Sequence, residues 1–332
     1  MHLDKNDIES ISAYLHAKGY LQAGDTIDSA ETPGDGNMNY TLRVKSGSKS
    51  FILKQARPYV EKYPQIPAPV ERASAEAGFY HAIQKHRSIS TLMPKLLGFD
   101  EANHLLVLED LGNGRDGTFL YKGMHQLSQN ELEQLCKYLN ALHNQVGGGV
   151  ANEAMANRSL RALNHEHIFV YPFLVDNGFD LDSVQPGLQK LSLRFKKNEL
   201  LKQNARQLGE RYMQDATTLL HGDFYPGSWL FVNNEVKVID PEFCFYGFAE
   251  FDLAVMKAHL MMAEHDEIFI NSMFDYYTKP PTFDEVLFDA FTGIEIMRRL
   301  IGLAQLPLTL TLQKKEGLLH KAAVLLKAKI EN

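Results

Sequence analysis

The chain has 332 residues, of which 34 are basic and 41 acidic, so its formal charge is 34 minus 41, or −7, and 45% of its residues are hydrophobic. This composition is that of a globular protein, and the length favours a two-lobed body over a single compact core. The negative charge and the scattered lysines and arginines argue against nucleic acid as a partner. No apolar run approaches the roughly 20 residues of a membrane helix, so we expect no membrane partner.

The N-terminus and the cysteines bear on the location of the protein. The first ten residues, MHLDKNDIES, contain no apolar stretch and predict no secretion signal. Cys136 and Cys244 are far apart and lack CxxC spacing, which predicts neither a disulfide framework nor a thiolate metal site. A cytoplasmic location is therefore expected.

The first third of the chain mixes helical and strand patterns. Apolar spacing followed by a glycine predicts a helix over residues 7–18, and alternation of apolar and polar residues predicts a β-hairpin over 39–55. Four prolines exclude a regular helix from residues 58–69. A further helix is predicted over 70–85 and a short buried strand over 105–108.

Asn113, Gly114 and Gly117 follow that strand and mark a boundary between two lobes. We therefore divide the chain into an N-terminal lobe, residues 1–112, and a C-terminal lobe, residues 113–332.

Beyond the boundary the sequence is mainly helical. Ser128 and Glu131 have the spacing of a capping box, in which each side chain accepts the free backbone N–H of the other residue. Three consecutive glycines, 147–149, predict a turn, and no firm element is predicted over 145–185. Two short strands, 229–232 and 236–239, are joined by two asparagines, which suit a tight hairpin. The remaining predicted helices cover residues 250–264, 284–304 and 313–330.

The densest chemical signal lies at the two ends of that second hairpin. Asp223 follows His221 and Gly222, and Asp240 follows the hairpin, so the short strands should bring the two carboxylates together. Converging carboxylates repel unless a cation neutralises them, and hard oxygen ligands suit Mg²⁺. Phosphoryl transfer uses such a pair: one Asp orients and deprotonates the attacking hydroxyl, and the other holds the metal. Taken alone, either residue would be read as a turn or helix cap.

Three further features complete a kinase-type nucleotide site. A turn with Gly34 and Gly36 precedes the first hairpin, and its backbone N–H groups could lie over phosphates. Lys54 ends the second strand of that hairpin, where it could reach phosphate oxygens, and Glu76 on the following helix could pair with it. Singly, the same features would be an ordinary turn, a solvated edge lysine and a surface glutamate.

Together these residues resemble the aminoglycoside phosphotransferase and choline kinase branch of the protein-kinase-like fold. The similarity is closer still to methylthioribose kinases and extends over about residues 33 to 305. The HGD triplet with DPEF is specific, whereas the glycine turn alone would not be. The motifs that carry the closer similarity are DGNMNY (35–40), KQARPYV (54–60), HGD (221–223) with Gly227-Ser228, DPEF (240–243) with Tyr246-Gly247, and Arg298-Arg299 with Ile301-Gly302.

The resemblance implies an α+β, bilobal protein-kinase-like fold with a small N-terminal antiparallel β lobe and a larger, mostly helical C-terminal lobe. It also implies ATP and Mg²⁺ as cofactors of a small-molecule kinase. Asp223 would be the catalytic base and Asp240 the main Mg²⁺ ligand. Glu242 would be a further metal ligand or metal-shell carboxylate, and the Ser228 hydroxyl would ligate Mg²⁺ or hold one of its waters.

The same resemblance assigns the nucleotide and acceptor residues. Arg298 and Arg299 would face the acceptor, since guanidinium forks suit ribose hydroxyls and developing phosphoryl charge. Because adjacent helical positions point about 100° apart, both can reach one ligand only near a helix end or kink, and one of them could instead form a salt bridge. Asp252 would brace the loop rather than catalyse. The nucleotide-binding residues would be Gly34, Gly36, Asn37, Asn39, Lys54, Glu76, Glu109 and Leu111.

Two departures from the family pattern concern the acceptor and the phosphate loop. Asn39 stands where a full glycine-rich loop has its third glycine, and residues 61–67 replace a segment that contains tryptophan in methylthioribose kinases. The expected acceptor is a hydroxyl of 5-methylthioribose or a similar sugar-like compound. Alternatives are an aminoglycoside, choline or another amino alcohol, or a regulatory pseudokinase that binds nucleotide without transfer. The resemblance makes a homodimer plausible.

Overall fold

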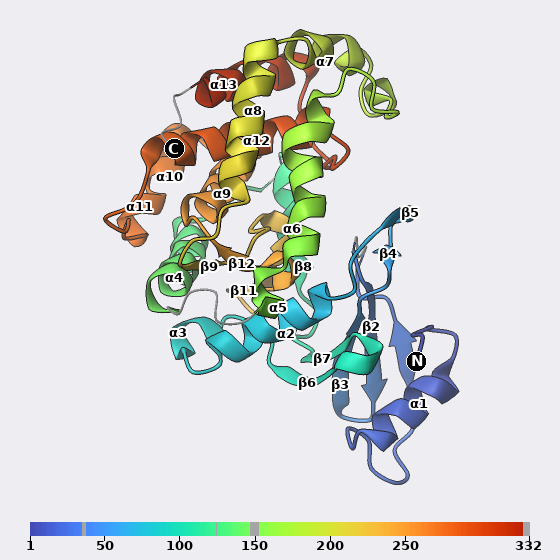
Figure 1. Ribbon diagram of the computed structural model, residues 1–332. Helices are drawn as coiled ribbons and strands as arrows, with labels where there is room; N and C mark the ends of the chain where they lie inside the picture. Colours follow the sequence, from blue (N-terminus) through green and yellow to red (C-terminus); the bar gives the residue numbers. More distant parts are fainter. Residues whose placement is uncertain (35–37, 124, 147–152, 328–332) are drawn as a thin grey trace.

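The computed structural model describes residues 1–34, 38–123, 125–146 and 153–327 (Figure 1). The predicted turn at residues 147–149 lies outside these ranges, as do Gly36 and Asn37 of the glycine turn. A sheet-rich lobe at the N-terminal end of the chain lies below a larger helical lobe (Figure 1). The predicted α+β architecture is therefore confirmed, whereas the division at residue 112 stays a prediction.

The smaller lobe is built on one antiparallel sheet with the strand order β1-β2-β3-β7-β6. The predicted hairpin over 39–55 is present as β2 and β3, which pair from Tyr40–Gln55 to Ser46–Lys49. Alternate side chains of β2 are buried, as the period-two pattern predicted. The five strands are β1 (Ser29–Glu31), β2 (Tyr40–Ser46), β3 (Lys49–Gln55), β6 (Leu96–Asp100) and β7 (Leu105–Glu109).

Helix α1 (Ile8–Ala17) covers one face of this sheet. Asp7 caps its first turn by accepting the N–H of Ser10, and Ile11 and Leu15 are buried among the sheet residues. Burial of these two side chains contributes roughly 1.5–3 kcal/mol each. The predicted helix over 7–18 is thus confirmed to within one residue at each end.

A second helix of this lobe, α2 (Arg72–Ile83), lies between the sheet and the helical lobe and is followed by the short α3 (Arg87–Ser90). Its side chains are buried around most of its circumference, and its many alanines allow this close approach on several sides. The proline-rich segment before it forms no helix, as predicted. It folds instead into an unpredicted hairpin of β4 (Tyr59–Val60) and β5 (Tyr63–Pro67) that extends from the sheet (Figure 1).

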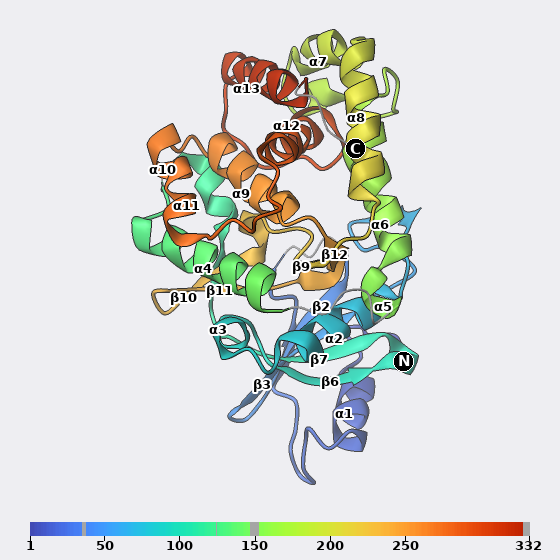
Figure 2. The ribbon, with the colours of Figure 1, turned by 60° about the vertical axis from the view of Figure 1, so that its left-hand side comes forward.

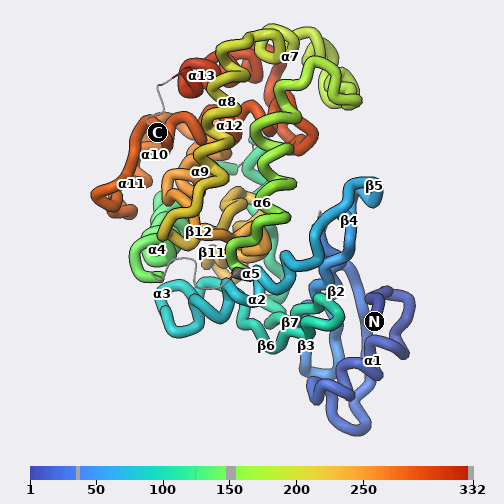
Figure 3. Tube along the Cα trace, in the orientation of Figure 1, coloured from blue at the N-terminus to red at the C-terminus, as the bar shows by residue number. Residues whose placement is uncertain are grey.

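The larger lobe is an assembly of helices around an apolar core. Ser128 and Glu131 form the predicted capping box at the start of α4. In Figure 2, α9 and α12 lie side by side at the centre of the lobe, and Figure 3 follows the chain from the smaller lobe to α13. The helices are α4 (Gln129–Gln145), α5 (Glu153–Ala156), α6 (Arg158–His165), α7 (Leu188–Lys196), α8 (Glu199–Tyr212), α9 (Glu250–Met262), α10 (Glu267–Asn271), α11 (Met273–Tyr276), α12 (Glu285–Ile301) and α13 (Leu312–Leu326).

The helices predicted over 70–85 and 313–330 are present as Arg72–Ile83 and Leu312–Leu326. Two others also end earlier than predicted. The helix predicted over 250–264 ends at Met262, because Glu264 adopts a positive φ of 61° that a helix cannot continue. The helix predicted over 284–304 ends at Ile301, where Gly302 turns to extended backbone. The early end of α12 matters for function because it places two arginines in the last helical turn. No helix in the described ranges is both long and apolar enough to cross a membrane.

Short strands frame the loops between the lobes. β10 (Trp229–Val232) pairs with β11 (Glu235–Val238) across Asn233 and Asn234, whose φ values of 52° and 62° are those of the predicted tight hairpin. β10 also pairs with β8 (Arg115–Asp116). β9 (Thr218–Leu220), which precedes the first acidic motif, pairs with β12 (Phe245–Gly247), which follows the second. One small sheet therefore fixes the chain on both sides of the two motifs.

Candidate active site

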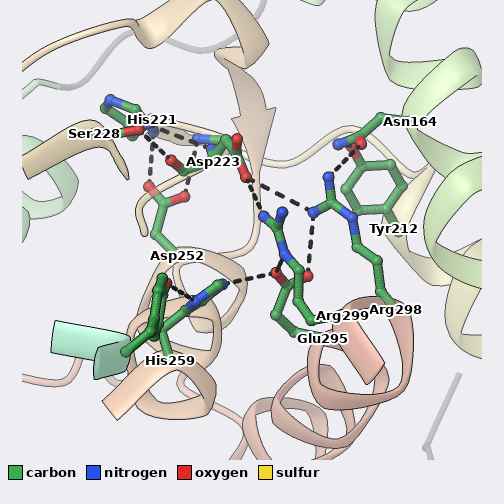
Figure 4. Close-up of polar contacts among 12 residues, drawn as sticks. Asn164, Tyr212, His221, Asp223, Ser228, Asp252, His259, Glu295, Arg298 and Arg299 are labelled. Atoms are coloured by element: carbon green, nitrogen blue, oxygen red, sulfur yellow. Dashed lines mark hydrogen bonds and ion pairs between the residues drawn. The ribbon is translucent and has the colours of Figure 1, made fainter. Parts of the chain in front are cut away.

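The HGD loop is held from below by a buried carboxylate. Asp252, in the first turn of α9, accepts the backbone N–H of His221 at 2.7 Å and that of Gly222 at 2.9 Å. His221 Nε2 lies 2.9 Å from the carbonyl oxygen of Ile239, which ties the loop to the second acidic motif. Figure 4 shows Asp252 pointing at this loop, with its carboxylate between the helix and the backbone. The predicted bracing role of Asp252 is confirmed.

Gly222 is required by both conformation and space. Its φ of 83° lies in the left-handed region, and a Cβ atom at this position would lie 2.0 Å from the carbonyl oxygen of Phe243. The HGD loop and the DPEF loop are therefore in backbone contact. Only glycine permits this approach.

The two acidic motifs meet as predicted. The backbone N–H of Ile239 donates to the carbonyl of Ser228 at 3.0 Å, and the Ser228 hydroxyl donates to the carbonyl of Asp223 at 2.9 Å. Asp240 follows Ile239 directly and adopts a left-handed φ of 61°, an uncommon conformation for a non-glycine residue. Such strain is typical of functional sites that the surrounding structure fixes in place.

Lys54 is buried at the centre of three carboxylates. Its Nζ lies 2.7 Å from Glu76 Oε2, 2.9 Å from Asp240 Oδ1 and 4.0 Å from Glu242 Oε1. Burial by itself lowers the pKa of Lys54, but Asp240, Glu76 and Glu242 outweigh it and raise the pKa above its ordinary value. The predicted Lys54–Glu76 pair is thus present, and the ammonium remains charged at all physiological pH values.

A cavity of about 230 Å³ opens beside this cluster between the two lobes. Lys54 and Asp240 are among its charged lining residues, and Ile52, Leu108 and Leu230 supply apolar walls. This combination suits a planar base with a charged tail, because flat apolar walls bind the base and the ammonium binds phosphate. Of the predicted nucleotide residues, the cavity is lined by Gly34, Lys54, Glu109 and Leu111.

Two predicted site residues, Asn39 and Glu242, contact each other and are not part of that lining. Asn39 donates to Glu242 Oε2 at 2.8 Å and accepts from Arg72 Nε at 2.9 Å. Arg72 also lies 3.3 Å from Glu242 Oε2 and is fully buried. Neither Asn39 nor Glu242 lines the cavity, because the buried guanidinium of Arg72 requires their oxygens as partners. Arg72 was not anticipated from the sequence.

Asp240 is the predicted metal ligand with an accessible carboxylate. Its side chain is 47% exposed, whereas Ser228 is buried and its hydroxyl is used by the Asp223 carbonyl. Across the described ranges, no group of three or more His, Cys, Asp or Glu residues could hold a metal ion. One carboxylate still fits Mg²⁺ that arrives with a nucleotide, because this ion keeps several waters and takes oxygens from phosphates.

The arginine pair converges on Asp223. Arg299 Nη2 lies 3.2 Å from Asp223 Oδ1, and Arg298 Nη1 lies 3.7 Å from the same oxygen (Figure 4). Both guanidinium groups also contact Glu295, at 2.6 Å from Arg299 Nε and 3.1 Å from Arg298 Nη1. The two side chains can meet because they occupy the last turn of α12, and both form salt bridges rather than one.

A second cavity of about 180 Å³ lies on the other side of this group. Asp223, Arg298 and Arg299 line it, together with Lys62, Tyr63 and Ile66 from the β4–β5 hairpin. Residues 303–306, which follow α12, and Leu163, Asn164 and His167 also contribute to its wall. Asp240 and Lys54 thus line one cavity, and Asp223 lines the other.

Sequence reasoning missed Glu295, although a signal for it exists. It stands three and four positions before Arg298 and Arg299, the spacing that brings side chains together on one face of a helix. Tyr225 was missed as well. Its ring lies under the Arg299 guanidinium at 4.7 Å, a cation–π contact that no sequence spacing indicates.

The whole arrangement has counterparts among known proteins. The family model described as "Phosphotransferase enzyme family" matches residues 29–288 of this chain. The chain belongs to that family. It is therefore an enzyme, a small-molecule phosphotransferase with an alcohol group as acceptor, and the resemblance noted from its motifs is confirmed.

Curated relatives of this phosphotransferase are named methylthioribose kinases. The protein from Bacillus velezensis is 30% identical over 89% of this chain and 84% of its own length. The protein from Bacillus cereus strain G9842 is 27% identical over 90% of this chain and 85% of its own. The similarity therefore extends over both lobes.

Solved structures show the same fold at low sequence identity. LicA in complex with AMP has a TM-score of 0.56 at 13% identity, with 98% of each chain covered. Spectinomycin phosphotransferase APH(9)-Ia, in complex with ADP and spectinomycin, has a TM-score of 0.57 at 15% identity and covers 96% of this chain and 97% of its own. The predicted bilobal, protein-kinase-like fold is confirmed.

Proposed function

We propose that this phosphotransferase transfers the γ-phosphoryl group of ATP to a hydroxyl of a neutral, sugar-like acceptor, with 5-methylthioribose as the acceptor that fits best. The observation that carries the proposal is the pair of neighbouring cavities, one lined by Lys54 and Asp240 and the other by Asp223 and the arginine pair. The nucleotide would occupy the first cavity and the acceptor the second.

Each residue then has a defined task. Asp223 accepts the proton of the acceptor hydroxyl, and Lys54, aimed by Glu76, binds phosphate oxygens. The backbone of residues 109–111 contacts adenine at the outer end of the cavity. Asp240 would hold Mg²⁺, which when bound neutralises the charge that develops on the transferred group.

The charges around the acceptor cavity favour a neutral acceptor. The carboxylate of Asp223 is already held by Arg298 and Arg299, and Lys62 adds a further positive charge to the described lining. A cationic aminoglycoside or amino alcohol would meet this positive charge without an unpaired carboxylate to compensate it. The guanidinium of Arg299 also covers one face of the Tyr225 ring, where a quaternary ammonium would otherwise bind.

The apolar part of the same cavity favours an acceptor with an apolar substituent. Val60, Ile66, Leu163 and Leu306 contribute to its wall, opposite the polar group around Asp223. A methylthio group would bury its surface there, while ribose hydroxyls faced the guanidinium forks. The methylthioribose kinases among the relatives support this choice of acceptor.

An acceptor panel tests the proposal. Purified protein with ATP and Mg²⁺ is offered 5-methylthioribose, ribose, choline and an aminoglycoside, and ADP formation and phosphorylated product are measured. Turnover should be greatest with 5-methylthioribose and should fall by roughly 10²- to 10⁴-fold in Asp223→Asn, the range for loss of a general base. Preferential turnover of choline or the aminoglycoside would establish the alternative acceptor class.

A regulatory pseudokinase, the other alternative considered from the sequence, would bind nucleotide and transfer phosphate to none of these compounds. The intact set of Lys54, Glu76, Asp223 and Asp240 favours the enzyme. The cytoplasmic location and the homodimer stay predictions, which fractionation and light scattering test.

A further inference from the structure

Glu295 is a buried carboxylate of the larger lobe to which no role has yet been assigned. It lies on α12, is 1% exposed and accepts contacts from three side chains. Arg299 Nε lies 2.6 Å and His259 Nε2 2.9 Å from its Oε1, and Arg298 Nη1 lies 3.1 Å from its Oε2 (Figure 4). Both carboxylate oxygens are therefore occupied by donors from the active-site side.

Charge balance explains how so many ionic groups are buried together. Burial alone raises the pKa of Glu295, but Arg299 and Arg298, followed by His259, hold it well below its ordinary range. Two carboxylates, Glu295 and Asp223, thus face two guanidinium groups. An unpaired guanidinium in this place would be costly, because a buried charge requires a partner.

Two further side chains, His259 and Tyr121, fix Glu295 itself. Tyr121 Oη lies 2.5 Å from His259 Nδ1, and His259 Nε2 faces the Glu295 carboxylate. Burial lowers the pKa of His259 to about 4, so the ring is neutral in the physiological range. A neutral ring with a carboxylate at Nε2 carries its proton there, and the Tyr121 hydroxyl then donates to Nδ1.

This chain of contacts also reaches the segment that follows α12. The carbonyl oxygen of Tyr121 accepts the backbone N–H of Thr309 at 3.2 Å and its hydroxyl at 3.0 Å. Thr309 ends the segment that begins with the cavity-lining residues 303–306. The network therefore joins α12, α9 and the chain after α12 around one carboxylate.

We propose that Glu295 is a positioning residue for phosphoryl transfer, an inference that rests on the function proposed above. It holds the Arg299 guanidinium so that Nη2 binds Asp223 Oδ1. The other oxygen, Oδ2, is thereby left to accept the proton of the acceptor hydroxyl. His259 and Tyr121 fix Glu295 in turn. Glu295, His259 and Tyr121 act in this proposal without touching the acceptor.

The test compares Glu295→Gln with a matched control on the same two helices. Asp289→Asn removes an α12–α9 ion pair of similar geometry, in which Asp289 Oδ1 lies 2.8 Å from Lys257 Nζ, away from the arginines. In Glu295→Gln we expect kcat to fall roughly 10- to 100-fold, the cost of a catalytic group misplaced by about 1 Å. The KM for ATP should change by less than about 3-fold, since Glu295 does not line the nucleotide cavity.

A spectroscopic measurement tests whether Glu295 fixes Arg299 without any need for an acceptor. In protein labelled with ¹⁵N-arginine, the Arg299 side-chain resonance, assigned by its absence in Arg299→Lys, should move and broaden in Glu295→Gln and stay unchanged in Asp289→Asn. If the wild type phosphorylates nothing, the proposed function fails, and this arm still reports whether Glu295 fixes Arg299. Wild-type kcat with an unchanged resonance in Glu295→Gln overturns the proposal.

A milder variant covers the case in which Glu295→Gln does not fold. Tyr121→Phe removes one hydroxyl and leaves His259 without its partner at Nδ1. We expect a several-fold fall in kcat, an unchanged KM for ATP and a smaller change of the same Arg299 resonance. If Tyr121→Phe folds with both kcat and the resonance of the wild type, the positioning network does not act on Asp223 and the proposal is overturned.

Discussion

Arg299 Nη2 lies 3.2 Å from Asp223 Oδ1, while the same guanidinium contacts Glu295 through Nε at 2.6 Å. The Arg299 guanidinium thus joins Asp223, the proposed catalytic base, to Glu295, a buried carboxylate on the same helix as Arg299. Arg298 reaches the same oxygen, at 3.7 Å, and both arginines lie in the last turn of α12, which ends at Ile301. The two guanidinium groups at Asp223 thus come from one helix end.

Replacement of Arg299 by lysine should separate charge from geometry. An ammonium keeps the charge but cannot hold two carboxylates in the fixed plane of a guanidinium fork. We expect Arg299→Lys to lower kcat by roughly 10- to 100-fold with little change in the KM for ATP. Arg298→Lys should have a smaller effect, since Arg298 Nη1 lies farther from Asp223 Oδ1, at 3.7 Å. Equal losses in the two variants would contradict this ranking.

Replacement of Gly222 by alanine should cost more stability than replacement of a glycine with the same backbone conformation. Gly19→Ala is the matched control, because Gly19 has a φ of 77° and no atom within 4 Å of an added Cβ. We expect a loss of about 1 kcal/mol for Gly19→Ala from the left-handed conformation. Gly222→Ala should lose more than about 3 kcal/mol, because its Cβ also meets the Phe243 carbonyl. Urea unfolding of both variants gives the comparison, and equal losses would refute the steric argument.

The dependence on Mg²⁺ should separate Asp240 from Glu242. Asp240 has a half-exposed carboxylate on the cavity proposed for the nucleotide, whereas Glu242 is held by Asn39 and Arg72. We expect Asp240→Asn to lose activity by roughly 10²-fold or more, an effect that excess Mg²⁺ partly restores. Glu242→Gln should lower the free energy of unfolding by about 3 kcal/mol, because it leaves Arg72 without its charged partner.

Titration of activity with Mg²⁺ at fixed ATP measures the difference. In Glu242→Gln the half-saturating Mg²⁺ concentration should equal that of the wild type. A large increase in this variant would instead show that Glu242 leaves Arg72 and binds the metal in the working enzyme. The same titration of Ser228→Ala tests the predicted role of that hydroxyl, which we expect to be confined to the loop.

The stability of the protein should fall with decreasing pH because of His259. Burial lowers its pKa in the folded state to about 4, from an ordinary value of 6.5. As the pH falls through 6.5 the unfolded chain takes up a proton that the folded protein does not bind until about pH 4. The stability present above pH 6.5 is therefore lost within this window, at up to about 1.4 kcal/mol per pH unit for one proton.

Urea unfolding between pH 7 and pH 4.5 tests this pH dependence. His259→Asn removes the titrating ring, so its free energy of unfolding should be lower at pH 7 but should decline less steeply with acid. The difference in slope should approach one proton. Identical slopes in the variant and the wild type would place the pH dependence in other groups, of which His221, also buried, is the first to examine.

Local sequence patterns were sufficient for several parts of the fold and the site. The hairpin over 39–55 and the Ser128–Glu131 capping box follow from short-range spacing and are present. The approach of the HGD and DPEF loops was predictable because a hairpin with two asparagines in its turn separates them. In each case the interacting residues are close in sequence, so the backbone has few ways to place them.

Contacts between segments far apart in the chain could not be predicted from the sequence. Nothing near Arg72 indicates that it would be buried against Asn39 and Glu242, residues 33 and 170 positions away. The sequence predicts only that the β4–β5 segment is not helical. That this hairpin lines the cavity beside Asp223 depends on how the lobes pack. Such contacts are decided by packing of whole elements, which no local pattern encodes.

What the sequence by itself determined was the chemistry: a mildly acidic, two-lobed chain with Asp223, Asp240, Lys54 and Glu76 at the spacings of phosphoryl transfer. Those spacings are local or bridged by one hairpin. What only the tertiary structure decided was the electrostatic setting of that chemistry. A buried charge is stable only with a partner, and the partners of Asp223 come from helix α12, more than seventy residues later in the chain.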